Sequence, residues 1–124
     1  MRLFKTKPFA RFAAKESIPD SVLRDAIRRA EGGLIDADLG GGVIKQRLAR
    51  PGQGKSGGFR SIVLFRRQAT AFFVYGFAKN DRDNIDRQEL SAFRSLASEM
   101  LAMDEKALIA ALKNGTIMEI ESNG

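Results

Sequence analysis

The feature that most constrains this chain is a stretch of 42 residues, from 39 to 80, that contains no Asp or Glu. Its hydrophobic pattern predicts three strands, at 43–49, 58–67 and 70–77, and their short connections predict antiparallel neighbours in one sheet. The stretch holds eight basic residues: Lys45, Arg47, Arg50, Lys55, Arg60, Arg66, Arg67 and Lys79. Positive charge concentrated on a sheet indicates a polyanionic partner, most simply nucleic acid.

Three of these cations are expected to lie together. Side chains alternate along a strand, so Lys45 and Arg47 share one face, and antiparallel pairing can bring Arg60 beside them. Three neighbouring cations repel one another unless an anion lies between them. The alternative is a solvated face from which long side chains extend into water. Tyr75 lies in a strand that is apolar on both faces, so we expect it to pack in the core.

The loop at 50–57 is rich in glycine and imitates two nucleotide-binding motifs. It satisfies G-x-G-x-x-G, and Gly54-Lys55-Ser56 resembles the end of a Walker A loop. Both motifs require a helix after the loop, whereas a strand is predicted here, and the first Walker glycine would fall at Ala49. The loop is therefore either a simple hairpin connection or a rim whose backbone N–H groups and Lys55 contact phosphate.

The composition excludes several classes of site. The chain has no Cys and no His, which removes disulfides, thiolate metal sites and the commonest general base. Catalysis would have to use Lys, Arg, Tyr or carboxylates, and no metal or other cofactor is expected. The basic start is not followed by the apolar segment of a signal peptide, and the most apolar run, 69–78, is too short to span a bilayer. We expect a cytoplasmic protein with no membrane contact.

In the sequence, segments with helical periodicity occur both before and after the predicted central strands. Pro19 separates the first two helices into a hairpin, and Asp86-x-x-Glu89 predicts a capping box at the start of the third. Four helices are expected, at 7–17, 20–31, 86–103 and 104–113. A short strand is expected at 2–5, on a sheet edge, and a loop at 34–42. The segment 116–121 is expected to be either a strand or an arm that binds a partner. The order predicts one α+β domain over residues 1–124.

Three segments in this order resemble the RelE/ParE superfamily of bacterial toxins: 44–48, 54–62 and 75–83. The closest resemblance is to its HigB-like branch, which has a basic strand, a GKSGG-type loop followed by Arg, and an AK-rich turn after the next strand. The resemblance covers about residues 1–100. Residues 104–124 lie beyond it, and one interpretation of them is a C-terminal extension specific to this branch.

The resemblance implies a RelE-like microfold, with an N-terminal helical hairpin, a curved antiparallel sheet of three to five strands, and C-terminal helices. It also implies the toxin of a type II toxin–antitoxin system, with a cognate antitoxin, which enters the ribosome and cuts mRNA as an endoribonuclease. Two alternatives stay open. One is a ParE-like toxin without enzyme activity that inhibits a protein such as DNA gyrase, and the other is a basic nucleic-acid-binding module.

By position, the resemblance assigns catalytic roles to Lys45, Arg47, Arg60 and Lys79, and RNA contacts to Arg50, Lys55 and Arg82. Lys45 would accept the proton of the ribose 2′-OH, while the arginines hold the scissile phosphate. The chain departs from the family pattern at one point. Related ribonucleases often carry Tyr or His a few residues after the basic turn, where this chain has Asn84 and Ile85. The acid that protonates the leaving group is therefore unassigned.

Overall fold

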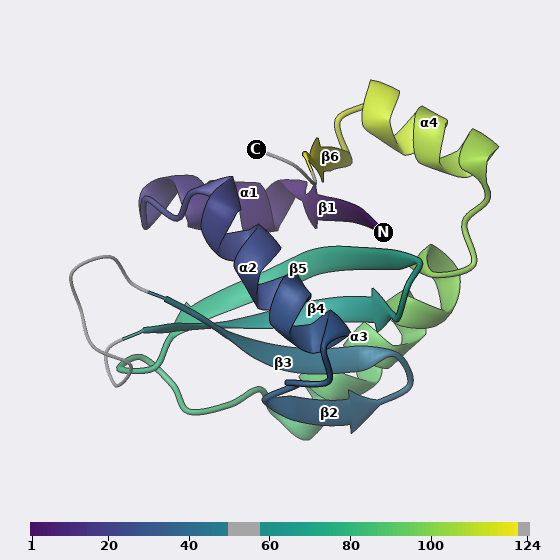
Figure 1. Cartoon of the computed structure of the whole chain (residues 1–124). Coiled ribbons are helices and arrows are strands. Elements are labelled where there is room, and N and C mark those ends of the chain that lie inside the picture. The colour runs from purple at the N-terminus through teal and green to yellow at the C-terminus, as the bar shows by residue number, and fades with distance from the viewer. Residues whose placement is uncertain (50–57, 122–124) are drawn as a thin grey trace.

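The computed structural model describes residues 1–49 and 58–121, which form six strands and four helices (Figure 1). The strands are β1 (Arg2–Thr6), β2 (Ala37–Gly40), β3 (Val43–Leu48), β4 (Phe59–Arg66), β5 (Thr70–Ala78) and β6 (Ile117–Ile120). The helices are α1 (Lys7–Lys15), α2 (Asp20–Glu31), α3 (Arg87–Met100) and α4 (Glu105–Lys113). The predicted α+β class and all four predicted helices are confirmed.

The strands form one open, curved sheet in the order β2-β3-β4-β5-β1-β6. Strands β2 to β5 are antiparallel neighbours, as predicted for the central three. The described sheet is larger than the expected three to five strands, and β1 pairs in parallel with β5. The edge position expected for 2–5 is wrong, because β6 covers the other side of β1. Leu3 and Phe4 are buried on opposite faces, as suits an inner strand.

Helices cover both faces of the sheet. α1 and α2 pack on one face, where Phe9, Leu23 and Ile27 join a core with Phe73. α3 and α4 supply the second core, on the opposite face. Gly76 lets α1 approach closely, because a Cβ there would lie 2.3 Å from a ring carbon of Phe12.

The segment expected to be a loop, 34–42, contains strand β2. Three glycines with positive φ, Gly40, Gly41 and Gly42, turn the chain from β2 into β3, so the two form a hairpin. A glycine-rich sequence conceals a strand because it lacks the β-branched and aromatic residues by which strands are recognised.

α3 leaves one part of its sheet face uncovered. The helix starts at the predicted capping box, in which Asp86 accepts the backbone N–H of Glu89 and the Glu89 carboxylate accepts that of Asp86. At its middle Phe93 contacts the ring of Tyr75 in β5, and just after its end Leu101 approaches Gly42 before β3. The helix therefore crosses the face diagonally, away from the end of β3 and the start of β4.

Candidate functional site

The part of the sheet that α3 does not cover carries the predicted basic residues. Arg47 of β3 lies directly opposite Arg60 of β4, and Lys45 lies two residues earlier on the same face. On the other side of Arg60, the directly opposed residue of β5 is Phe77. The predicted gathering of Lys45, Arg47 and Arg60 on one face is confirmed, and we call these three residues the basic face.

Two of the three cations lack a carboxylate partner. Lys45 and Arg60 are half-buried, and within residues 1–49 and 58–121 neither forms an ion pair. With the described residues, the Arg60 guanidinium makes one long hydrogen bond, 3.4 Å, to the carbonyl of Phe59. Lys79 is exposed at the end of β5, where its backbone N–H donates to the Gly58 carbonyl at 3.4 Å. It therefore lies at the same end of the sheet as Arg60.

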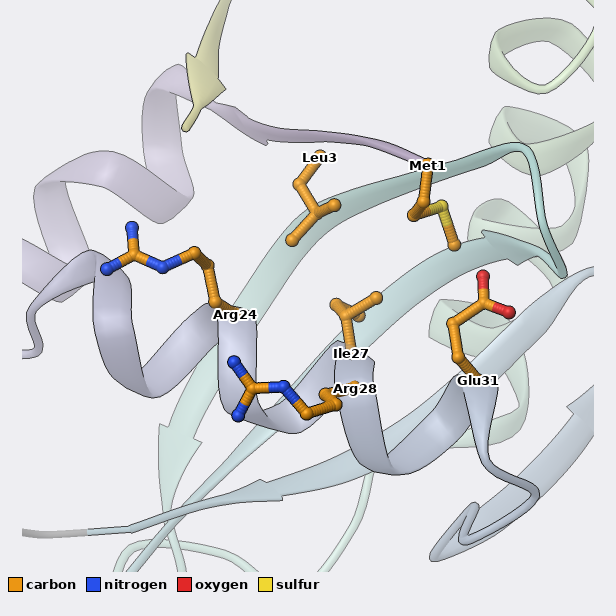
Figure 2. Close-up of a pocket in the computed structure, with 6 residues that line it drawn as sticks. All are labelled: Met1, Leu3, Arg24, Ile27, Arg28 and Glu31. Carbon is orange, nitrogen blue, oxygen red and sulfur yellow. The ribbon is translucent and has the colours of Figure 1, made fainter. Parts of the chain in front are cut away.

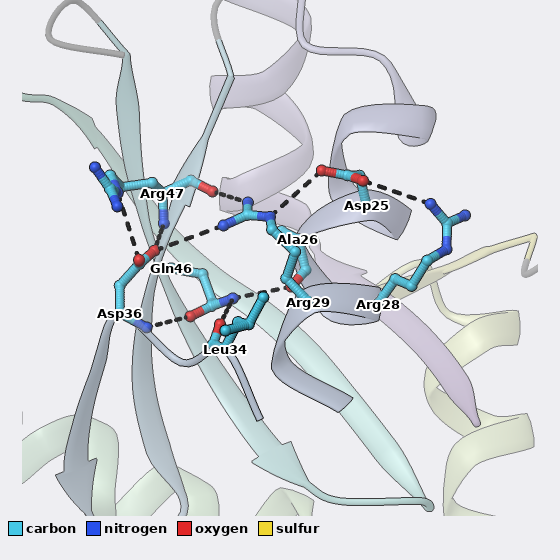
Figure 3. A network of polar contacts seen from close by, with 8 residues as sticks. All are labelled: Asp25, Ala26, Arg28, Arg29, Leu34, Asp36, Gln46 and Arg47. Carbon is cyan, nitrogen blue, oxygen red and sulfur yellow. Dashed lines mark hydrogen bonds and ion pairs between the residues drawn. The ribbon is translucent and has the colours of Figure 1, made fainter. Parts of the chain in front are cut away.

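Arg47 differs from its neighbours because it has a counter-ion (Figure 3). The Asp36 carboxylate accepts the backbone N–H of Arg47 at 2.5 Å and lies 3.4 Å from its Nε. Arg29 of α2 approaches the same carboxylate at 3.9 Å and donates to the Arg47 carbonyl at 2.6 Å. Counting charge along the sequence missed this contact, since Asp36 lies just before the acid-free stretch.

Gln46 holds this corner of the molecule together. Its side chain is fully buried beneath β3, where Nε2 donates to the carbonyls of Ala26 and Leu34 at 2.9 and 3.3 Å. Its Oε1 accepts the backbone N–H of Asp36 at 2.7 Å. The amide thus links α2 to the start of the β2 hairpin and fixes the position of Asp36 beside Arg47.

Arg82, which is expected to contact RNA, forms its contacts with other residues of the protein. Its guanidinium forms an ion pair with Glu89 at 2.5 and 3.0 Å and donates to the Tyr75 hydroxyl at 3.1 Å. It also lies over the rings of Tyr75 and Phe77, 5.8 and 5.7 Å from their centroids. A contact with RNA would require it to exchange some of these partners.

The ion pair between Arg82 and Glu89 changes the pKa of both side chains. The hydrogen bonds from Arg82 are the main cause that lowers the pKa of Glu89, and the backbone N–H of Asp86 adds to this effect. The carboxylate in turn raises the pKa of Arg82. The pair therefore stays ionised at neutral pH and ties the turn after β5 to the start of α3.

Tyr75 packs against the second core, as expected, at the edge of that core. It is half-buried and lies on the same sheet face as the basic residues, because Ile62, which is opposite Lys45 on one side, is opposite Tyr75 on the other. Its partial exposure distinguishes it from Phe72 and Phe77, which are buried residues of the same cluster. The phenol is thus a member of the site that the sequence did not indicate.

The remaining predicted cations do not join this cluster in the described structure. Arg50 and Lys55 fall in 50–57, outside the described residues. Arg66 and Arg67 lie at the far end of β4, about 20 Å from Arg60 at the usual rise per strand residue. The positive charge of the sheet is therefore divided between its two ends.

Comparison with known proteins decides the family. The family model described as the RelE toxin of the RelE/RelB toxin–antitoxin system matches residues 1–120 of the 124. The chain belongs to the RelE toxin family. As a RelE-type toxin it has an antitoxin for a partner. A search of curated proteins gives no match.

A cavity of about 280 Å³ lies on the opposite face of this RelE toxin, between α2 and β1 (Figure 2). Leu3 and Ile27 form its floor, and both belong to the core on the α1 and α2 side. Of the cations at its rim, Arg24 donates to the Glu121 carbonyl at 3.1 Å and Arg28 pairs with Asp25 at 3.4 Å. The cavity is therefore separate from the basic face.

Two further features of the toxin bear on its chemistry. In the described parts of the chain, no cluster of three or more Asp and Glu side chains is placed to hold a metal ion. Among the same residues, no helix has the length and apolarity needed to cross a membrane.

Proposed function

We propose that this RelE toxin is a ribosome-dependent endoribonuclease that cuts mRNA in the cytoplasm and so inhibits translation. The observation that carries the proposal is the direct pairing of Arg47 with Arg60 across β3 and β4, with Lys45 beside them. The family match supports the coarser part, a toxin that acts with an antitoxin. The HigB-like branch stays a prediction.

The arginine pair supports an anionic ligand on energetic grounds. Like charges directly opposite each other in a sheet destabilise it by up to about 1 kcal/mol. Asp36 offsets this repulsion only from the Arg47 side. A phosphate between the two guanidinium groups would accept hydrogen bonds from both and remove the repulsion. The half-buried position of Arg60 limits screening by salt and strengthens such a contact.

The proposed reaction uses the RNA's own nucleophile. Lys45, in its neutral form, accepts the proton of the ribose 2′-OH, and the 2′-oxygen attacks the adjacent phosphorus. Arg47 and Arg60 stabilise the charge that develops on the phosphate oxygens. The bond from phosphorus to the 5′-oxygen then breaks, which leaves a 2′,3′-cyclic phosphate and a 5′-hydroxyl. Lys79, at the same end of the sheet, orients the RNA strand.

The antitoxin is expected to be acidic where it meets this face. Complementary charge would speed association and would cover cations that otherwise bind mRNA. The predicted RNA contacts of Arg50, Lys55 and Arg82 belong to the same proposal, with Arg82 shared between Glu89 and the RNA.

The proposal is tested with the purified chain and two substrates. Ribosomes programmed with a defined mRNA are incubated with the toxin and the 5′ ends are mapped, while DNA supercoiling by gyrase is assayed in parallel. We expect cuts in ribosome-bound mRNA, none in free mRNA, and normal supercoiling. Intact mRNA with inhibited gyrase would overturn the proposal in favour of a ParE-like toxin. Binding of RNA without cleavage would reduce the chain to a nucleic-acid-binding module.

A further inference from the structure

The proposed cleavage needs a proton donor as well as an acceptor. When the phosphorus–oxygen bond breaks, the 5′-oxygen leaves as an alkoxide unless it is protonated at the same time. The chain has no His or Cys to supply that proton. The Glu89 carboxylate, which is paired with Arg82 of the turn after β5, is held ionised by Arg82 and cannot donate. Among the described residues whose side chains lie on this face of β3, β4 and β5, the candidates are the cations and one phenol.

That phenol is Tyr75, the only tyrosine of the chain. Arg60 and Tyr75 are diagonal neighbours across β4 and β5, because Arg60 opposes Phe77 and Tyr75 lies two residues earlier on the same face. The backbones of diagonal neighbours in an antiparallel pair are about 7–8 Å apart, so two long side chains at these positions are within reach of one phosphate group. One phosphate could thus meet a guanidinium on one side and a phenol on the other.

The contacts of Tyr75 leave its proton free. Arginine can only donate hydrogen bonds, so the 3.1 Å contact from Arg82 occupies a lone pair of the phenol oxygen and not its hydrogen. No acceptor for that hydrogen occurs among the residues that the structure describes. Ring contacts with Phe77 and Phe93, at 5.8 and 5.9 Å, fix the orientation of the phenol.

The Arg82–Glu89 pair explains how the phenol oxygen is held. Glu89 fixes Arg82 with two hydrogen bonds, and Arg82 brings a positive charge onto the phenol oxygen. A cation there stabilises the phenolate that forms when the proton leaves. The capping box anchors Glu89 at the start of α3, so the whole unit is built on a rigid element.

We infer that Tyr75 is the general acid of this toxin, and that Arg82 and Glu89 are its positioning residues. The inference rests on the proposed endoribonuclease function. As the phosphorus–oxygen bond breaks, its electron pair goes to the 5′-oxygen, which takes the Tyr75 proton and leaves as a 5′-hydroxyl. The phenolate that remains is stabilised by Arg82 and regains a proton from water.

The test changes the leaving group. An mRNA is made with sulfur in place of the 5′-bridging oxygen at the mapped cleavage site, because a thiolate leaves without protonation. On the ordinary mRNA, Tyr75→Phe should slow single-turnover cleavage on programmed ribosomes by about 10²- to 10⁴-fold, the usual contribution of a general acid. On the 5′-thio mRNA it should cut at nearly the rate of the parent.

Controls separate the other roles. Arg60→Ala, which removes a phosphate ligand, should be slow on both substrates. If Tyr75→Phe is equally slow on both, or slow on neither, Tyr75 is not the acid. If the 5′-thio mRNA restores the cleavage rate of Lys79→Met but not that of Tyr75→Phe, then Lys79 is the general acid. In all these cases the proposed function stands, provided that the parent chain cuts the ordinary mRNA. If the parent chain does not cut it, both the proposed function and the assignment of Tyr75 are refuted.

A second replacement covers the case in which Tyr75→Phe fails to fold. Since the chain has one tyrosine, growth on 3-fluorotyrosine alters this residue alone and keeps its hydroxyl. Fluorotyrosine is the stronger acid, so the alkaline decline of the cleavage rate should move to lower pH. An unchanged pH profile would overturn the inference.

Discussion

Replacement of Gln46 by Met should weaken the fold markedly, although the two side chains are similar in size. Gln46 is fully buried, and its amide joins three backbone groups. Met can replace the packing but none of the hydrogen bonds. The N–H of Asp36 would lose its acceptor, and the carbonyls of Ala26 and Leu34 would each lose a donor.

The expected loss of stability follows from these three groups. A buried donor left unsatisfied costs about 1–3 kcal/mol, and the hydrogen bonds to the carbonyls add about 0.5–1.5 kcal/mol each. The Ala26 carbonyl keeps its bond within α2, so its contribution lies at the low end. The sum is about 2–5 kcal/mol, which corresponds to a loss on the order of 10 °C in Tm for a domain of this length.

Urea unfolding of the parent chain and Gln46→Met measures this difference, with Gln88→Met as the matched control. Gln88 is exposed near the start of α3, so its replacement should change stability by less than about 0.5 kcal/mol. A loss for Gln46→Met no larger than that of the control would refute the assignment of Gln46 as the link between α2 and the β2 hairpin.

Three further predictions concern the site and its support. Arg60→Ala should reduce mRNA cleavage by about 10²- to 10³-fold, about 3–4 kcal/mol in the transition state, with an unchanged Tm, whereas Arg67→Ala at the far turn should cut like the parent. Gly76→Ala should destabilise the domain by about 1–3 kcal/mol in thermal unfolding, because the added methyl meets the Phe12 ring at 2.3 Å. Because the pKa of Glu89 is lowered in the fold, its stabilising contribution should be present above pH 4.5 and lost as pH falls through the lowered value; acid titration of the unfolding free energy against Glu89→Gln measures this.

Each of these has a result that would count against it. Equal cleavage by Arg60→Ala and Arg67→Ala would remove Arg60 from the site. Gly32→Ala is the control, because a methyl group there meets nothing closer than 3.6 Å. If Gly76→Ala is as stable as this control, then α1 can shift away from the added methyl group. A stability difference between the parent and Glu89→Gln that does not change with pH would show that the carboxylate adds nothing through its charge.

The central strands and the basic face could be predicted because their determinants are local. The period of two fixes which side of β3 carries Lys45 and Arg47, and a hairpin connection fixes Arg60 opposite Arg47. The capping box at Asp86 likewise depends on residues three apart and was read directly from the sequence.

The rest depends on contacts between distant parts of the chain. The parallel pairing of β1 with β5 joins residues about 70 positions apart, and no local pattern specifies it. Asp36 reaches Arg47 only because β2 folds back along β3. The apolar neighbours of Tyr75 predicted that it packs against the core, but its contacts with Phe93 and Arg82 come from parts of the chain that follow β5 and could not be predicted.

The central claim, cleavage of ribosome-bound mRNA by its own 2′-OH, has one direct test. Two mRNAs are programmed onto ribosomes in the same Mg²⁺ buffer, one all-ribose and one with a single 2′-deoxy residue at the mapped cleavage site. The account predicts that the toxin cuts the first, leaving a 2′,3′-cyclic phosphate, and leaves the second intact at that position. A cut at the same position in the deoxy-substituted mRNA would contradict it, because the nucleophile would then have to come from elsewhere.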